Sequence, residues 1–179
     1  DREQAKGRPF FYYSCGASVS EVEVDTYTGT YTVSQVDILH DVGESINPGI
    51  DLGQVEGGFI QGMGWLTTEE LVWGQDGRLQ TNAGASYKIP AVGDTPKQFN
   101  VALLKDSKNH EATIYHSKAV GEPPFMHGIS VWSALRDAIW AFGGEKTNPQ
   151  LDAPATPERV LWALQEAKHQ ADPTARGAS

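Results

Sequence analysis

The sequence predicts an α+β fold, and three patterns support that prediction. Residues 16–41 alternate apolar and polar side chains around a central turn, which is typical of a β-hairpin. Residues 51–66 and 123–143 repeat apolar side chains every three or four positions, which is typical of helices. Strand-like and helical segments do not alternate regularly, so hairpins packed on helices are favoured over a doubly wound sheet.

The predicted first hairpin turns at residues 27–30. Its second arm, 31–41, is rich in Thr, Val and Ile, which suit a half-buried pleated surface. Residues 47–49 (Asn-Pro-Gly) interrupt the chain after this arm. A second hairpin is expected around residues 75–77 (Gln-Asp-Gly), because Asp-Gly is a strong turn signal.

Two further strands are predicted at 99–106 and 111–120. A last helix is expected to begin at Pro157, with Thr156 as its cap, and to end near Gln170. Together with the two earlier helical segments, this gives three main helices.

These elements form a single predicted domain covering residues 1–179, with about 7–170 ordered and both ends frayed. The chain has no initiator Met and enters strand-like sequence almost at once, which indicates a piece of a longer protein. It begins without the apolar core of a signal peptide. A single cysteine, Cys15, interpreted as a small and partly buried apolar side chain, fits a cytoplasmic setting.

Composition and charge exclude several classes of function. A formal net charge of −9 and the lack of any Lys/Arg cluster argue against nucleic-acid binding. No apolar run approaches the ~20 residues that span a bilayer, so no membrane partner is expected. No histidines are spaced as metal ligands beside a carboxylate, and one cysteine cannot build an iron–sulfur site, so no protein-only metal site is expected. Glu69 and Glu70 should face opposite sides of a strand at a solvated edge.

Glycines interrupt the first predicted helix. Its apolar face consists of Val55, Phe59, Met63 and Leu66, and its glycines are Gly53, Gly57, Gly58, Gly62 and Gly64. Each interior glycine costs a helix about 0.5–1 kcal/mol relative to alanine, so something must approach this backbone closely. Another helix is the simpler explanation, and a ligand is the alternative. Gln54 sits in the first turn, where its amide could meet a polar ligand.

Glu122 stands directly before Pro123 and Pro124, where a predicted strand gives way to a helix. A residue before proline favours extended geometry, so its backbone should be stiff. From the residues alone, two roles remain open: a capping or solvated carboxylate, which is the commoner role, and a general base held at the lip of a pocket.

Several long motifs in this chain resemble a known family when taken together in order. They are "VSEVEVDTYTG", "DILHDVGESINPGIDLGQVEGGFIQGMGWLTTEELVW", "SYKIPA" and "SKAVGEPPF". They are similar to the C-terminal portion of the molybdenum-binding subunit of bacterial xanthine dehydrogenase, in the xanthine oxidase/aldehyde oxidase family. The resemblance runs from about Gly7 to Gln170.

The resemblance implies roles for particular residues. The glutamate of the family's G-E-P-P motif is the catalytic general base, and it corresponds to Glu122. The glutamine of G-Q-V-E-G, here Gln54, corresponds to a residue that hydrogen-bonds molybdopterin. The remaining positions implied to line the cofactor pocket are Ser86, Lys118, Val120 and Gly121.

The resemblance also implies cofactors and partners. The complete enzyme carries a molybdenum–molybdopterin cofactor, with FAD and 2Fe-2S clusters on other parts of the assembly, and oxidises hypoxanthine and xanthine to urate. Expected partners are therefore the rest of the molybdenum-binding subunit, the iron–sulfur/FAD subunit and the purine. The family's other substrate-pocket residues are missing from this chain, so two alternatives stay open. One is a non-catalytic piece that only packs or self-associates; the other is a related hydroxylase of another N-heterocycle or an aldehyde.

Overall fold

A computed structural model describes residues 3–171, and the predicted frayed C-terminal tail lies outside this range. Nine elements follow one another within residues 3–171. The strands are β1 (Gly16–Val24), β2 (Tyr31–His40) and β3 (Gln98–Leu103), and the α-helices are α1 (Pro48–Thr67), α2 (Ile129–Gly143) and α3 (Pro157–Ala171). Three short 3-10 helices complete the order: η1 (Val92–Asp94), η2 (Ile114–His116) and η3 (Pro123–Gly128).

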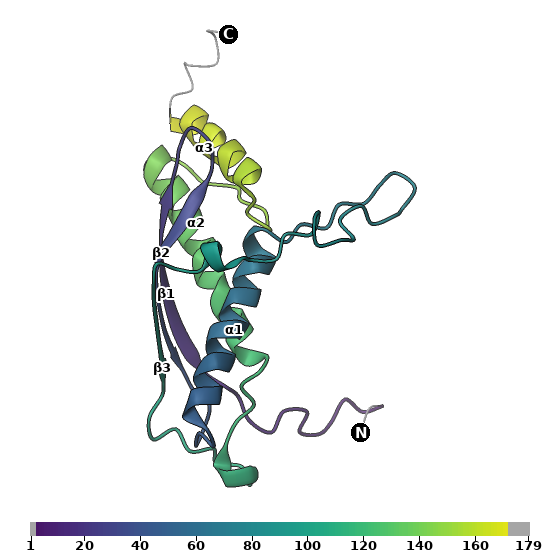
Figure 1. Cartoon of the computed structure of the whole chain (residues 1–179), viewed down its shortest axis with the longest axis vertical. Helices are drawn as coiled ribbons and strands as arrows, with labels where there is room; N and C mark the ends of the chain where they lie inside the picture. The colour runs from purple at the N-terminus through teal and green to yellow at the C-terminus, as the bar shows by residue number, and fades with distance from the viewer. Residues whose placement is uncertain (1–2, 172–179) are drawn as a thin grey trace.

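The strands form one mixed sheet in the order β1-β2-β3. The β1–β2 pair is antiparallel, whereas β2 and β3 run parallel and are joined through α1. Figure 1 shows α1 and α2 on the same side of the sheet, and α3 at the end of the molecule where the β1–β2 turn lies. The α+β prediction and the three main helices are confirmed.

The core lies between the sheet and its helices. Alternate residues of β2 point inward, and the fully buried Val36 belongs to the same hydrophobic cluster as Phe59 of α1 and Leu135 of α2. The first turn of α3 continues this core through Val160. Burial of these apolar side chains is the main stabilising term of the fold. No helix among residues 3–171 is long and apolar enough to cross a membrane.

Turn and cap chemistry explains where the predicted elements begin and end. Gly29 adopts φ +73° in the β1–β2 turn, and a Cβ there would lie 2.2 Å from the Pro157 carbonyl oxygen, so this turn packs on the start of α3. The first helix begins at Pro48, three residues before the predicted start, because Asn47 caps it by accepting the Ile50 N–H at 3.3 Å.

Two strand predictions were wrong. Residues 111–120 form no strand; they contain η2, with left-handed backbone at Tyr115 (φ 50°) and His116 (φ 57°). The second hairpin forms its turn, but its two arms are joined by a single bridge, Trp73 with Leu79. It lies in the segment between α1 and η1, residues 68–91, which projects from the body (Figure 1) and is called the excursion below.

Two side-chain environments were also predicted wrongly. Cys15 is exposed rather than partly buried. Glu69 is buried and accepts a hydrogen bond of 2.5 Å from the Tyr87 hydroxyl, because the chain folds back at the base of the excursion. Its neighbour Glu70 pairs with Arg159 at 2.7 Å instead of facing only solvent.

Three glycines let α1 and η3 meet backbone to backbone. A Cβ on Gly62 would lie 2.0 Å from the Phe125 carbonyl oxygen, and one on Gly128 would lie 2.4 Å from the Gly62 carbonyl carbon. A Cβ on Gly58 would lie 3.1 Å from the Pro124 Cβ. Close packing therefore explains part of the glycine pattern of α1, but not all of it: a Cβ on Gly53 or Gly57 would meet nothing within 4 Å.

A matched pair of substitutions on α1 tests this packing. Gly62→Ala should lower the free energy of unfolding by roughly 2 kcal/mol or more, because the added methyl overlaps the backbone of η3. Gly57→Ala should raise it by about 0.5–1 kcal/mol, because the methyl meets nothing and alanine favours the helix. Urea denaturation of both variants measures the difference, and equal effects would contradict the packing account.

Candidate functional site

Glu122 is exposed at the start of η3, and the next three residues hold its backbone in place. Its carbonyl oxygen accepts the Phe125 N–H at 3.0 Å, the first hydrogen bond of η3. Its φ of −92° and ψ of −38° are helical, so the extended geometry predicted for a residue before proline is wrong here. The backbone is nevertheless fixed, because Pro124 is fully buried against α1.

The carboxylate of Glu122 does not act as a helix cap. No side-chain hydrogen bond caps η3, and among residues 3–171 no hydrogen bond or ion pair joins this carboxylate to another group. A charged side chain is thus held on a rigid segment with its oxygens available to something outside the described chain.

Gln54 and Gly121 lie next to each other, although the sequence separates them widely. Gln54 is exposed on α1, and its Oε1 lies 3.6 Å from the position of a Cβ on Gly121. Gly53 and Gly57 leave the neighbouring backbone of α1 bare. The structure therefore brings together Gln54, Gly121 and Glu122 at one end of the α1–η3 contact.

Lys118 has a structural role that the sequence did not reveal. Its ammonium pairs with the buried carboxylate of Asp41 and also donates to the Tyr13 carbonyl oxygen at 2.9 Å. Burial alone would raise the pKa of Asp41, but the hydrogen bond from Lys118 and the Gly43 N–H hold it below its ordinary value. The next predicted residue, Val120, is half-buried and packs against the core.

Ser86 stands apart from the other predicted cofactor residues. It lies on the excursion, and its hydroxyl bonds within its own turn by donating to the Ala83 carbonyl oxygen at 3.2 Å. The excursion extends away from the body, as Figure 1 shows. No contact among the described residues brings the Ser86 hydroxyl to Gln54 or Glu122.

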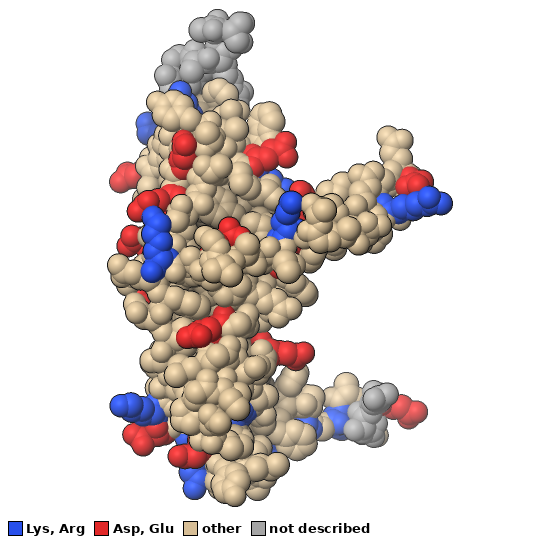
Figure 2. All heavy atoms as spheres, viewed as in Figure 1, with Lys and Arg blue, Asp and Glu red and all other residues tan. Residues whose placement is uncertain are grey.

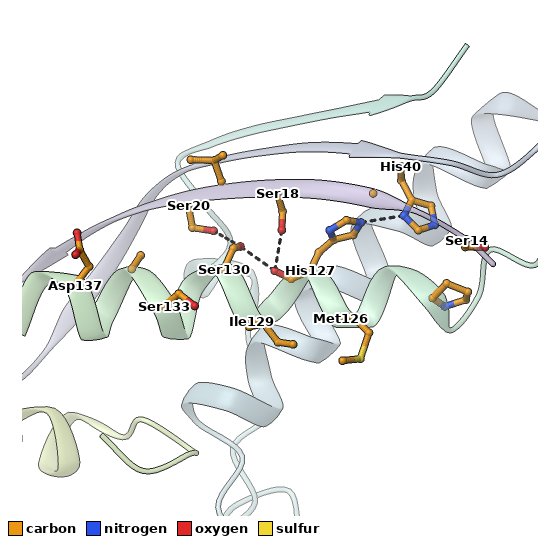
Figure 3. A pocket seen from close by; sticks show the side chains of 14 residues that line it. Ser14, Ser18, Ser20, His40, Met126, His127, Ile129, Ser130, Ser133 and Asp137 are labelled. Atoms are coloured by element: carbon orange, nitrogen blue, oxygen red, sulfur yellow. Dashed lines mark hydrogen bonds between the residues drawn. The ribbon is translucent and has the colours of Figure 1, made fainter. Parts of the chain in front are cut away.

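A groove beside β1 contains a group of polar residues that sequence reasoning missed. The groove has a volume of about 870 Å³ and runs between β1 and the η3–α2 segment (Figure 3). Ser20 and Ser130 share a hydrogen bond of 2.6 Å, and the Ser130 hydroxyl donates to the His127 carbonyl oxygen at 2.8 Å. Ser18 donates to the same carbonyl at 3.3 Å. Only the fold places these residues together.

Two buried histidines lie at one end of this groove. His40 Nδ1 and His127 Nε2 are 2.9 Å apart, and their rings meet edge to face. Gly16 makes room for them, because a Cβ there would lie 2.6 Å from the His127 ring. The His40 Nε2 atom is buried and has no hydrogen-bond partner among the described residues.

Both imidazoles are poor bases in this position. Burial, together with the neighbouring His127 and Lys118, lowers the pKa of His40 to about 4, although Asp41 opposes this shift. Burial also lowers the pKa of His127. The two rings are therefore neutral near pH 7, with one N–H donated between them, and no group of three or more metal-ligating side chains surrounds them within residues 3–171.

The face of the molecule that Figure 2 shows carries charges of both signs. Figure 2 shows acidic and basic side chains scattered over the viewed face without a basic patch. The α1–η3 contact offers the Glu122 carboxylate, which has no partner among the described residues. Next to Gly121 it offers the amide of Gln54, which can both donate and accept, on a helix with bare backbone at Gly53 and Gly57. This set can accept a proton from a reacting group while holding a flat polar molecule.

Comparison with known proteins gives concordant results. The family model described as "Molybdopterin cofactor-binding domain" matches residues 1–96 of the 179. Xanthine dehydrogenase of Oryza sativa subsp. japonica is 50% identical over 173 residues, covering 91% of this chain and 13% of that protein. Xanthine dehydrogenase/oxidase of Gallus gallus is 50% identical over 161 residues, covering 88% and 12%. The chain thus spans about an eighth of the length of these relatives.

A solved structure agrees in fold. Quinoline 2-oxidoreductase from Pseudomonas putida 86 superposes with a TM-score of 0.71 at 28% identity, covering 81% of this chain and 18% of that one. This arrangement of sheet and helices therefore also occurs as a segment of a longer oxidoreductase chain.

The histidine pair predicts how stability depends on pH. Unfolded His40 takes up a proton near pH 6.5, whereas the folded residue resists protonation down to about pH 4. Stability should therefore be complete above pH 6.5 and should fall as the pH drops towards 4, by up to about 3 kcal/mol from His40. Urea denaturation at a series of pH values measures this loss. The loss of stability should be smaller in the His40→Gln variant. An unchanged dependence of stability on pH in that variant would contradict the assignment of the loss to His40.

Proposed function

Because the chain belongs to the molybdopterin cofactor-binding domain family, we propose that it forms part of a molybdenum hydroxylase of the xanthine dehydrogenase type. In that enzyme it contributes the general base Glu122 and one wall of the molybdopterin site. The observation that carries the proposal is the unpartnered Glu122 carboxylate beside the Gln54–Gly121 pair. The identity of about half to xanthine dehydrogenases supports oxidation of hypoxanthine and xanthine to urate as the reaction.

The residues present are chemically suited to molybdopterin. A pterin edge carries both donors and acceptors, and the exposed amide of Gln54 can pair with both kinds. A flat ring system also needs close approach, which Gly53 and Gly57 permit because nothing lies within 4 Å of a Cβ there. When bound, the cofactor supplies the oxygen-transfer and two-electron chemistry of hydroxylation.

Glu122 is proposed to accept the proton released during hydroxylation. A general base must stand at a fixed position within hydrogen-bond reach of the proton it removes. The buried Pro124 and the Phe125 N–H fix the backbone of Glu122, and no cap or ion pair among the described residues occupies its carboxylate. The packing of η3 on α1 thereby positions the base relative to Gln54.

The other implied cofactor residues have narrower proposed roles. Lys118 is engaged with Asp41, so we assign it the task of anchoring the segment that leads to Glu122. Val120 and Gly121 would line the pocket chiefly through their backbone, since Val120 packs inward and Gly121 has no side chain. Ser86 would meet the cofactor only from the excursion, as part of a different wall.

The proposed setting is a larger cytoplasmic assembly. The remaining part of the molybdenum-binding polypeptide would supply the other walls of the pocket, and FAD and 2Fe-2S clusters would lie on other parts of the enzyme. The small share of the relatives' length that the chain covers, 12–13%, supports the presence of further polypeptide in this assembly.

A related hydroxylase is the second candidate, because quinoline 2-oxidoreductase shares the fold at 28% identity. Turnover of xanthine, quinoline and an aldehyde by the complete enzyme separates these substrates. Molybdenum and pterin content of the isolated chain tests the remaining alternative of a non-catalytic piece: we expect the isolated chain to be empty and the complete enzyme to be loaded.

The role of Glu122 is tested in the complete enzyme. Glu122→Gln should lower kcat roughly 100- to 10,000-fold, because the proton acceptor is removed, while molybdenum and pterin content stay unchanged. Glu56→Gln, at an exposed glutamate of α1 outside the proposed site, is the matched control and should keep its activity. Near-wild-type turnover of Glu122→Gln would rule out this residue as the base.

The role of Gln54 has a separate readout. Gln54→Ala should reduce the fraction of enzyme that retains pterin through purification, because the donor and acceptor of the amide are lost. Gln61→Ala removes another exposed glutamine two turns further along α1 and should leave occupancy unchanged. Equal cofactor occupancy in both variants would count against the assignment.

A further inference from the structure

The outer edge of the sheet is unusually open. β1 pairs with β2 on one side, and no strand among residues 3–171 lies on its other side. The Asp41 N–H donates to the Cys15 carbonyl oxygen at 2.8 Å, which fixes the phase of the antiparallel ladder. Because bonded pairs alternate in such a ladder, Ala17 and Val19 bond to β2.

The residues of β1 that alternate with Ala17 and Val19 present their backbone groups to the open edge. The N–H and C=O groups of Gly16, Ser18 and Ser20 belong to the non-bonded pairs, so they point away from β2. These three residues form a regular row of donors and acceptors along the edge, which is the pattern that an added strand recognises.

The first half of β1 lacks the features that keep strands from pairing, whereas Glu21, Glu23 and a register shift between Glu21 and Val22 protect the second half. Residues 16–20 read Gly-Ala-Ser-Val-Ser and contain neither charge nor proline. Natural edge strands are usually protected by charged side chains, proline or short length. The opposite edge strand, β3, is six residues long and has Lys97 directly before it. β1 is therefore the edge that is suited to continuation of the sheet.

The groove beside β1 runs along this edge and has room for a strand. Its two walls carry small side chains, with Ser14, Gly16, Ser18 and Ser20 on one side and Ser130, Ser133 and Ala134 on the other (Figure 3). The wall from residue 14 to residue 20 is about 20 Å long, which is the length of an ordinary strand.

The groove has exposed apolar side chains along it, with the exposed Asp137 as a charged residue of its lining. Val19 is 70% exposed and Met126 is 62% exposed, and both line the groove. A strand laid along β1 would cover these side chains while its backbone paired with Gly16, Ser18 and Ser20. An added strand would therefore both pair with the backbone groups of the edge and cover the exposed apolar side chains.

We propose that an extended segment of the parent polypeptide, outside this chain, adds to β1 as a further strand and lies in the groove over α2. The chain covers only 12–13% of its xanthine dehydrogenase relatives, and most of the polypeptide of each relative lies outside the matched region. A segment of the same polypeptide reaches the edge at high effective concentration. A second copy would instead bring another net charge of −9 against the first. The strand does not depend on the role of Glu122.

Hydrogen exchange at single-residue resolution tests the added strand. In the complete polypeptide, the amides of Gly16, Ser18 and Ser20 should exchange about tenfold or more slowly than in the isolated chain, and should approach the protection of Ala17 and Val19. The amides of Ala17 and Val19 serve as the internal control in both samples, because β2 protects them whenever the hairpin is folded.

Two outcomes would overturn the proposal. The first is rapid exchange of Gly16, Ser18 and Ser20 in the complete polypeptide while Ala17 and Val19 stay protected. The second is slow exchange in the isolated chain that grows with protein concentration together with a dimer in sedimentation, which would assign the edge to a second copy. Should the isolated chain fail to fold, the comparison of outward and inward amides within the complete polypeptide decides alone.

Discussion

The site depends on one contact, the backbone-to-backbone packing of α1 on η3. Gly62 and Gly128 have no room for a Cβ, and Gly58 has almost none, because the two helices meet at these points. A glycine-rich helix is intrinsically weak, so this contact and the core beneath it must offset the loss. The same contact fixes the position of the segment that follows Gly121 relative to α1.

This fixed position of η3 on α1 determines where the candidate site residues lie relative to each other. Gln54 comes from α1 and Glu122 from the start of η3, and they share a location only because the two elements are locked together. Pro123 and Pro124 add stiffness on one side, and the Lys118–Asp41 ion pair anchors the other. The same helix thus uses Gly58 and Gly62 for packing, whereas a Cβ on Gly53 or Gly57 would meet nothing within 4 Å.

Local patterns predicted most of the architecture and only part of the site. The hairpin and the three helices were predictable, because turn residues, the Thr156–Pro157 start and apolar periodicity all act locally. The strand predicted at residues 111–120 was wrong. The β-branched and aromatic side chains of this segment favour a strand, but tertiary hydrogen bonds hold Tyr115 and His116 in a left-handed turn.

The features that were missed depend on contacts between distant segments. The His40–His127 pair joins β2 to η3, and nothing in either local sequence indicates the other partner. The distinction between packed and open glycines likewise required the position of η3. For Glu122, the residues alone left capping and catalysis open; the structure excludes a capping bond, and the family membership makes catalysis the better proposal.

The central claim is that helix packing positions the proposed base, and a double-mutant cycle in the complete enzyme tests it most directly. The cycle measures kcat for Gly62→Ala, Glu122→Gln and the combined variant in cofactor-loaded protein. If the packing acts through Glu122, Gly62→Ala lowers turnover in the parent enzyme but causes no further loss in the Glu122→Gln background. Two losses that multiply independently would contradict the account.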